Sequence, residues 1–94
     1  GAVSEETAIQ MVAGALERFD ADYALATTGI MGPASDNDEK PVGTVWIAAG
    51  NRQHIVTKQL NLGYDRLRNI QSTALQALNL LRKFIIDEEA KNSV

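Results

Sequence analysis

The stretch YALATTG at residues 23–29 decides how this chain folds. Residues 23–28 form a short, nearly unbroken apolar run, with Asp20 and Asp22 before it and Gly29 after it. A run of this kind is typical of a β-strand that is covered on both faces. We therefore expect an interior strand here, with a neighbouring strand on each of its two edges.

Two further strands are expected on the C-terminal side of this stretch. Residues 29–42 are rich in glycine, proline and short polar side chains, which predicts a loop. The run TVWIAA at residues 44–49 and the run at residues 55–62 are both typical of strands, and Gly50 and Asn51 form the turn between them. Because this connection is so short, the two strands must pair antiparallel.

Helices are expected on both sides of these strands. Ser4 is a good N-cap for a helix over residues 5–18, and the carboxylates of Glu5 and Glu6 suit the positive end of its dipole. A long helix is predicted over residues 65–86, followed by a polar, frayed tail. This order of helices and strands predicts a layered α/β fold. The expected buried stripe of the long helix consists of Leu67, Ile70, Ala74, Leu78, Leu81 and Ile85.

The composition limits the classes of function. The chain has 94 residues, a net charge of −3 and a sequence pI of about 5.0, whereas general nucleic-acid binding usually needs a basic surface. It has no cysteine and a single histidine, so it can form neither a disulfide nor a thiolate metal site. No apolar run reaches the length of a membrane span, and no signal peptide opens the sequence. We expect a soluble, cytoplasmic protein that binds neither nucleic acid nor membrane.

The end of the first strand is one candidate functional segment. In open α/β sheets, ligands bind beyond the carboxyl ends of strands, and here the strand ends in Thr27 and Thr28 before GIMGP at residues 29–33. Backbone N–H groups in such a turn can hold an oxyanion or a phosphate. The alternative is a Gly-Pro loop that only leads the chain out of the sheet.

The start of the last helix is a second candidate. Asp65 is a suitable N-cap, but Arg66 and Arg68 place two cations at the positive end of the helix dipole, at a cost of roughly 0.3–1 kcal/mol each. An anion bound between the helix terminus and the guanidinium groups would resolve this conflict. The alternative is that both arginines point into solvent or pair with acids. Elsewhere, we interpret the acidic run at residues 36–40 as a solvated loop and His54 as a surface residue.

Three segments resemble one known family. The sequence TTGIMGPASDNDEKPVGTVWIA at residues 27–48 is similar to the signature of the CinA C-terminal domain family, which typically has TGIAGP, a variable polar loop and then KPVGTV. GAVSEETA at residues 1–8 matches the usual start of the family's helix before this strand. GYDRLRNIQ at residues 63–71 looks like the family's motif that leads into the last helix. The resemblance therefore covers nearly the whole chain.

This resemblance implies a three-layer α/β/α fold with a mixed sheet, of which the chain would hold about three strands and two helices. It also implies hydrolysis of the carboxamide of nicotinamide mononucleotide to nicotinate mononucleotide and ammonia, without a metal or other cofactor, in a protein that often forms homo-oligomers. Carried over onto matching positions, the family's site assigns Thr28 to hydrogen bonding near the reacting carboxamide. The substrate-binding positions implied in this way are Gly29, Ile30, Gly32, Arg66 and Arg68, of which the arginines would hold the phosphate.

The family's proposed nucleophile is a serine in an ESCTG-type segment, and this sequence contains no such segment. We therefore interpret residues 1–94 as the C-terminal part of a single amidase domain, whose preceding segment would be a partner and would complete the site. Such a part should expose an apolar sheet edge and apolar helix faces. The alternative function is a non-catalytic module that binds a nucleotide or another protein and is linked to competence or the DNA damage response.

Overall fold

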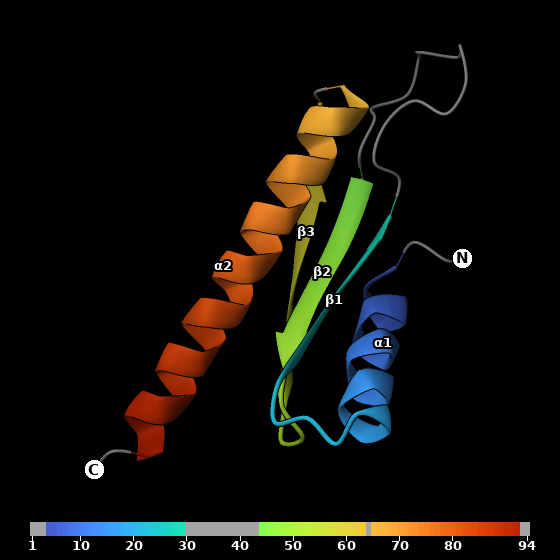
Figure 1. Cartoon of the computed structure of the whole chain (residues 1–94). Helices are drawn as coiled ribbons and strands as arrows, with labels where there is room; N and C mark the ends of the chain where they lie inside the picture. The colour runs from blue at the N-terminus through green and yellow to red at the C-terminus, as the bar shows by residue number, and fades with distance from the viewer. Residues whose placement is uncertain (1–3, 30–43, 64, 93–94) are drawn as a thin grey trace.

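The structure of the chain, a computed structural model, describes residues 4–29, 44–63 and 65–92 (Figure 1). The predicted order of helices and strands is confirmed. Neither of the described helices is long and apolar enough to cross a membrane. The elements are α1 (Glu5–Arg18), β1 (Ala24–Gly29), β2 (Thr44–Gly50), β3 (Ile55–Asn61) and α2 (Arg66–Asn92).

The three strands form one antiparallel sheet in the order β1-β2-β3. β2 is central, and its pairing with β1 runs from Ala24 opposite Gly50 to Gly29 opposite Val45. Among the described strands, β1 has a neighbour on one edge only, so the second neighbour expected from the sequence is not seen there. Among the three described strands, β2 is the one with a neighbour on each edge, and most of its residues are buried, whereas most residues of β1 are only partly buried. These strands include no parallel pair, which a mixed sheet requires.

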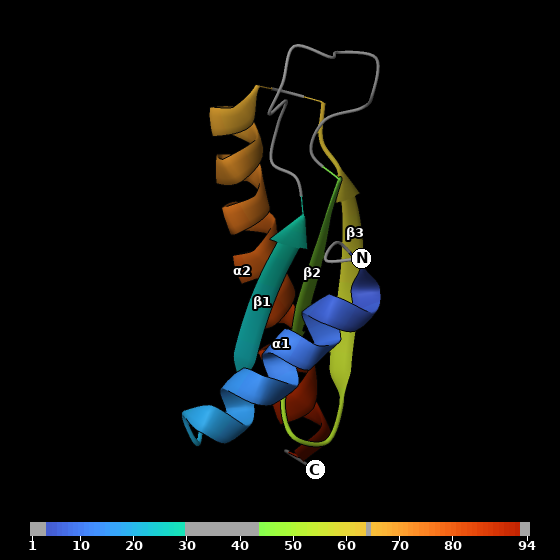
Figure 2. The same ribbon diagram turned by 90° about the vertical axis from the view of Figure 1, so that its right-hand side faces the viewer.

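Helices α1 and α2 cover opposite faces of the sheet, which gives the expected three-layer α/β/α arrangement (Figures 1 and 2). Ala8, Val12 and Leu16 recur with helical spacing on α1 and pack on one face against Ala26 and Ala48. Successive residues of β2 alternate between this core and a second core, as strand geometry requires. The second core, on the α2 face, consists of Val45, Ile47, Leu60, Leu62 and Ala77.

Helix α2 differs from the sequence prediction in its length and in the face that it buries. It continues to Asn92 instead of ending at residue 86. Leu67 and Leu78, two members of the predicted buried stripe, are 64% and 58% exposed. A second stripe of side chains on α2, beside the predicted one, faces the sheet. Small residues in this second stripe, such as Ala77, let the helix pack close to the sheet. The buried side chains of α2 are Asn69, Thr73, Ala77 and Phe84.

Gly29, the last residue of β1, lies against the backbone of β2. A Cβ atom added here would come within 2.6 Å of the Cα atom of Val45 and would also collide with the carbonyl oxygen of Thr44. The φ angle of Gly29 is 153°, which residues with a side chain rarely adopt. Gly14, in the middle of α1, instead has open space where a Cβ atom would lie.

We therefore expect Gly29→Ala to lower the free energy of unfolding by about 1–3 kcal/mol, through collision and backbone strain. The matched control Gly14→Ala should raise it by about 0.5–1 kcal/mol, because alanine is favoured inside a helix and meets no other atom here. Urea unfolding followed by circular dichroism measures both values. A Gly29→Ala variant as stable as the unmodified chain would contradict the close approach of β1 and β2.

Candidate functional site

The two segments that the sequence singles out meet at one end of the molecule. β1 ends at Thr28 and Gly29, and α2 begins at Arg66 at the same end (Figure 1). We call this end, formed by the last residues of β1 and the first turn of α2, the site end. The N-terminus of a helix is a position at which proteins bind anionic ligands.

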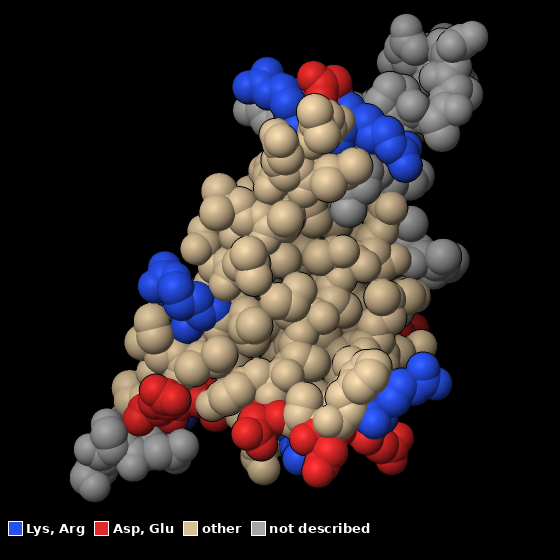
Figure 3. Space-filling view, in the orientation of Figure 1, with Lys and Arg blue, Asp and Glu red and all other residues tan. Residues whose placement is uncertain are grey.

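The first turn of α2 is capped as predicted. The Asp65 carboxylate accepts a hydrogen bond from the Arg68 N–H at 2.9 Å, and the Asp65 carbonyl accepts one from the Asn69 N–H at 2.9 Å. The side chains of Arg66 and Arg68 are exposed, and Figure 3 shows basic side chains at this end. Within the described part of the chain, Arg66 takes part in no ion pair.

The two threonines of β1 lie on opposite faces of the sheet. Thr28 is paired with Trp46, which packs against the α1 core, so its side chain belongs to that face. Thr27 lies on the other face, where it lines a groove beside α2. Thr28 and Arg66 thus share one end of the molecule but not one face of the sheet. Thr27 belongs to the candidate segment identified from the sequence, but of the two threonines only Thr28 was assigned a role in the reaction.

Part of the predicted site lies outside the described residues. This applies to Ile30 and Gly32, two of the substrate-binding positions expected from the sequence. Gly29 is described, and its close contact with β2 explains why glycine is needed there without any ligand. The described part of the predicted site therefore consists of Thr28, Gly29, Arg66 and Arg68, and Thr27 lies outside it on the other face of the sheet.

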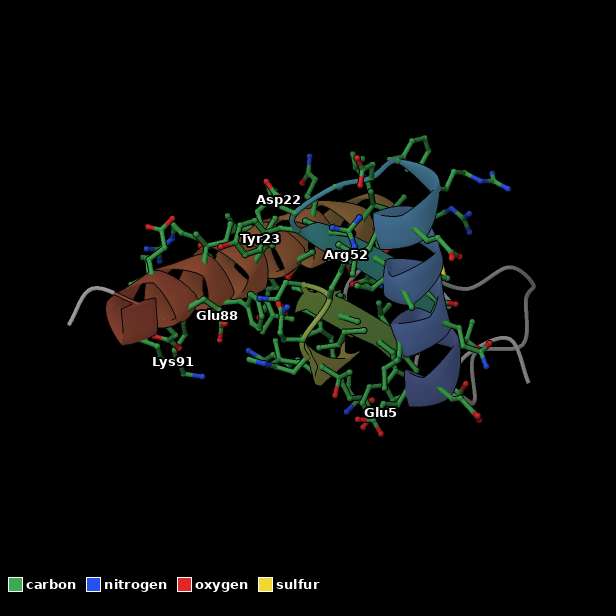
Figure 4. The ribbon with its side chains drawn as sticks, turned by 90° about the horizontal axis from the view of Figure 1, so that it is seen from below. Glu5, Asp22, Tyr23, Arg52, Glu88 and Lys91 are labelled. Carbon is green, nitrogen blue, oxygen red and sulfur yellow. The ribbon has the colours of Figure 1, made fainter. Side chains whose placement is uncertain are left out.

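A second polar cluster lies at the opposite end, where the β2–β3 turn meets the last turns of α2 (Figure 4). Glu88 accepts hydrogen bonds from Asn51 Nδ2 at 3.3 Å and from Lys91 Nζ at 3.2 Å, and its carboxylate lies 3.0 Å from His54 Nε2. The His54 ring also packs edge-on against Phe84, with ring centroids 5.0 Å apart. His54 is exposed, as the sequence predicted, and it also joins the turn to α2, which continues beyond its predicted end.

These contacts favour the ionised form of Glu88. Partial burial raises the pKa of its carboxyl, but the hydrogen bond from Lys91 and the charge interactions with His54 and Lys91 outweigh burial, so the pKa lies below the ordinary glutamate value. The described residues contain no group of three His, Cys, Asp or Glu that could hold a metal ion. The contacts of Glu88 with Asn51 and His54 attach the last turns of α2 to the β2–β3 turn, and we call them the Glu88 anchor.

The chain is similar in sequence to known proteins. Residues 1–85 match the model of the CinA C-terminal domain family. A "CinA-like protein" of Cytophaga hutchinsonii is 46% identical over 83 residues, which cover 88% of this chain and 20% of that protein. A "putative competence-damage inducible protein" of Caldicellulosiruptor bescii is 44% identical over 87 residues, which cover 93% of this chain and 21% of that protein.

Solved structures share the fold of the chain. The competence/damage inducible protein CihA of Agrobacterium tumefaciens superimposes with a TM-score of 0.79 at 38% identity, over 89% of this chain and 52% of that one. The competence damage-inducible protein A of Klebsiella pneumoniae superimposes with a TM-score of 0.80 at 33% identity, over 90% of this chain and 53% of that one. The chain thus spans about half the length of these solved relatives and about a fifth of the curated relatives that it matches.

The Glu88 anchor predicts a pH dependence of stability. Because its folded-state pKa is lowered, its contribution is fully present above the ordinary glutamate pKa of about 4.3 and is lost as the pH falls through the folded-state value. The stability difference between the unmodified chain and Glu88→Gln should therefore shrink from about pH 7 to about pH 3. Chemical unfolding at several pH values measures it, with the exposed Glu89→Gln as control. A difference that stays constant over this range would contradict the anchor.

Proposed function

The chain belongs to the CinA C-terminal domain family, and on that premise we propose that the domain to which it contributes hydrolyses the carboxamide of nicotinamide mononucleotide. Water replaces the amide nitrogen at the carbonyl carbon, which yields nicotinate mononucleotide and ammonia. The observation that carries this proposal is the site end, where a strand terminus with hydroxyl side chains and a helix start with two arginines lie at one end of the molecule. Such an end suits a ligand that has both an anionic phosphate and an amide carbonyl.

The start of α2 supports binding of the phosphate. The positive end of a helix dipole and an exposed guanidinium group both favour an anion. Because the Asp65 carboxylate already accepts the N–H of Arg68, we assign the phosphate to the guanidinium of Arg66 and not to the helix N–H groups. The exposed side chain of Arg68, two residues further on the helix, is the second phosphate ligand in this proposal.

The end of β1 supports the reaction at the carboxamide. Attack on the carbonyl carbon places negative charge on its oxygen, and nearby hydrogen-bond donors stabilise that charge. We assign this role to the Thr28 hydroxyl and to backbone N–H groups at Gly29, Ile30 and Gly32. We assign the nucleophile and its base to the half of the solved relatives that this chain does not match.

We also propose that the protein is cytoplasmic and homo-oligomeric. The sequence has no cysteine, which suits a reducing compartment where disulfides do not form. Homo-oligomers are implied by the family resemblance and are the commonest assemblies of soluble proteins.

A complete domain can be assembled by joining residues 1–94 to the unmatched half of the Agrobacterium tumefaciens relative. In this domain we expect Arg66→Ala to raise the KM for nicotinamide mononucleotide about 10–100-fold with little change in kcat, because a lost charge-assisted hydrogen bond affects substrate and transition state alike. Ammonia release at several substrate concentrations measures both constants. Arg82→Ala, at an exposed position further along α2, is the matched control. An Arg66→Ala effect below about twofold would show that the assignment is wrong.

Thr28→Val tests the reaction end of the site in the same domain. This substitution keeps the shape of the side chain and removes its hydroxyl group, so we expect kcat to fall about tenfold or more with little change in Tm. Thr27→Val, on the opposite face of β1, should change kcat less than about twofold. A larger loss with Thr27→Val would place the carboxamide on the α2 face. A complete domain that releases no ammonia at all would favour the non-catalytic module.

A further inference from the structure

We infer that Asn69 is a positioning residue that fixes the first turn of α2, so that the guanidinium of Arg66 keeps one orientation toward a bound phosphate. This inference rests on the proposed function. Asn69 lies three residues after Arg66, which is close to one helical turn. The Arg66 side chain is exposed, whereas the Asn69 side chain is fully buried. Asn69 therefore acts through the arginine and does not contact the substrate.

The attachment of the first turn of α2 to the sheet depends on this one side chain. Of the described residues 65–72, only Asn69 is buried. Its backbone N–H donates a hydrogen bond to the Asp65 carbonyl at 2.9 Å, and the Asp65 carboxylate accepts the Arg68 N–H at 2.9 Å. The cap and the buried residue thus belong to one hydrogen-bonded turn. A shift of Asn69 would therefore also move Arg66.

The buried stripe of α2 changes from polar to apolar along the helix. Its members recur with helical spacing, and the two polar members lie nearest the site end. Hydrophobic contact has no direction, so it holds a helix on a sheet without fixing its rotation. Hydrogen bonds from buried polar groups depend on direction and therefore select one arrangement. In chain order, the buried stripe consists of Asn69, Thr73, Ala77 and Phe84.

Stability alone does not explain the two polar members of this stripe. Burial of a carboxamide or a hydroxyl costs free energy unless the group is hydrogen-bonded, and an apolar side chain at the same place avoids that cost. Within the described part of the chain, no buried side-chain nitrogen or oxygen lacks a hydrogen-bond partner, so the groups of Asn69 and Thr73 are satisfied. A satisfied polar pair specifies a single geometry, and here it lies at the site end.

The same polar contact extends to the end of β1. Thr73 lines one side of a groove of about 360 Å³ between α2 and β1, and Thr27 lines the other side. Thr27 directly precedes Thr28, to which we assign hydrogen bonding at the carboxamide. A substrate with a phosphate at one end and a carboxamide at the other needs a constant separation between its two binding groups. Asn69 and Thr73 keep this separation by holding the start of α2 beside the end of β1.

The opposite end of α2 is attached independently. The Glu88 anchor joins it to the β2–β3 turn, about 28 Å along the helix from Asn69. Phe84 is buried near this anchor, and its ring packs against His54. Loss of the Asn69 contact should therefore loosen the first turn while the rest of α2 stays in place.

The test is a double-mutant cycle in the complete domain, in which residues 1–94 are joined to the unmatched half of the Agrobacterium tumefaciens relative. We expect Asn69→Leu to raise the KM for nicotinamide mononucleotide about 5–20-fold and to change kcat less than about twofold. Combined with Arg66→Ala it should have no further effect, so the double variant should match Arg66→Ala within about twofold. A purely structural role would lower kcat and would add to the effect of Arg66→Ala.

Phe84→Leu is the matched control, because Phe84 is also buried on α2 but lies at the opposite end. It should lower Tm, as Asn69→Leu does, but leave KM unchanged within about twofold. Circular dichroism checks that each variant folds. Thr73→Val, which removes only a hydroxyl group, replaces Asn69→Leu if that variant does not fold, and it should raise KM about 2–5-fold.

Two measurements separate this inference from the proposed function, because neither needs activity. Asn69→Leu should speed hydrogen exchange of the Arg68 and Ile70 N–H groups at least about tenfold and weaken binding of inorganic phosphate as Arg66→Ala does. These results in a domain that releases no ammonia would support the inference and contradict the proposed function. The inference is overturned if exchange or phosphate binding is unchanged, if the effects of the two substitutions add, or if Phe84→Leu raises KM equally.

Discussion

Burial of β2 on both faces is the constraint on which the rest of the structure depends. Val45 and Ile47 belong to the core under α2, and Ala48 belongs to the core under α1. The flanking strands must run close to β2, and Gly29 and Gly50 lie where any side chain would collide with a neighbouring backbone. This arrangement positions the functional elements, because pairing with β2 places the end of β1 and packing on β2 places α2. The site end therefore follows from the sheet core.

The order of the elements could be predicted because local patterns determine it. Apolar runs bounded by aspartate and glycine predicted the strands. Ser4 and Asp65 cap the two helices at the expected positions. The buried face of α2 could not be predicted, because two stripes on that helix compete and the sheet packs against the one that contains Thr73 and Ala77. Its extension beyond residue 86 also depends on contacts made by Glu88 across the fold, which a local pattern cannot reveal.

The candidate site shows the same division between local and non-local information. The helix cap and the two arginines of the first turn were predicted from the sequence, whereas the exposure of the arginine side chains came from the structure. The separation of Thr27 and Thr28 onto opposite faces became clear only with the strand register. The stripe predicted to be buried, which includes Ile70 and Leu78, is apolar but exposed in this chain. The prediction that this stripe is buried was therefore wrong for these residues, because the sheet packs against a different stripe of α2.

Hydrogen exchange of the backbone N–H groups of β1 tests most directly the central claim that this strand has an unoccupied edge. In the chain alone, we expect the N–H groups on that edge to exchange at least about tenfold faster than those of β2. In the presence of the other half of the domain, the same groups should become protected. Slow exchange throughout β1 in the chain alone, or continued fast exchange in the complex, would contradict the account.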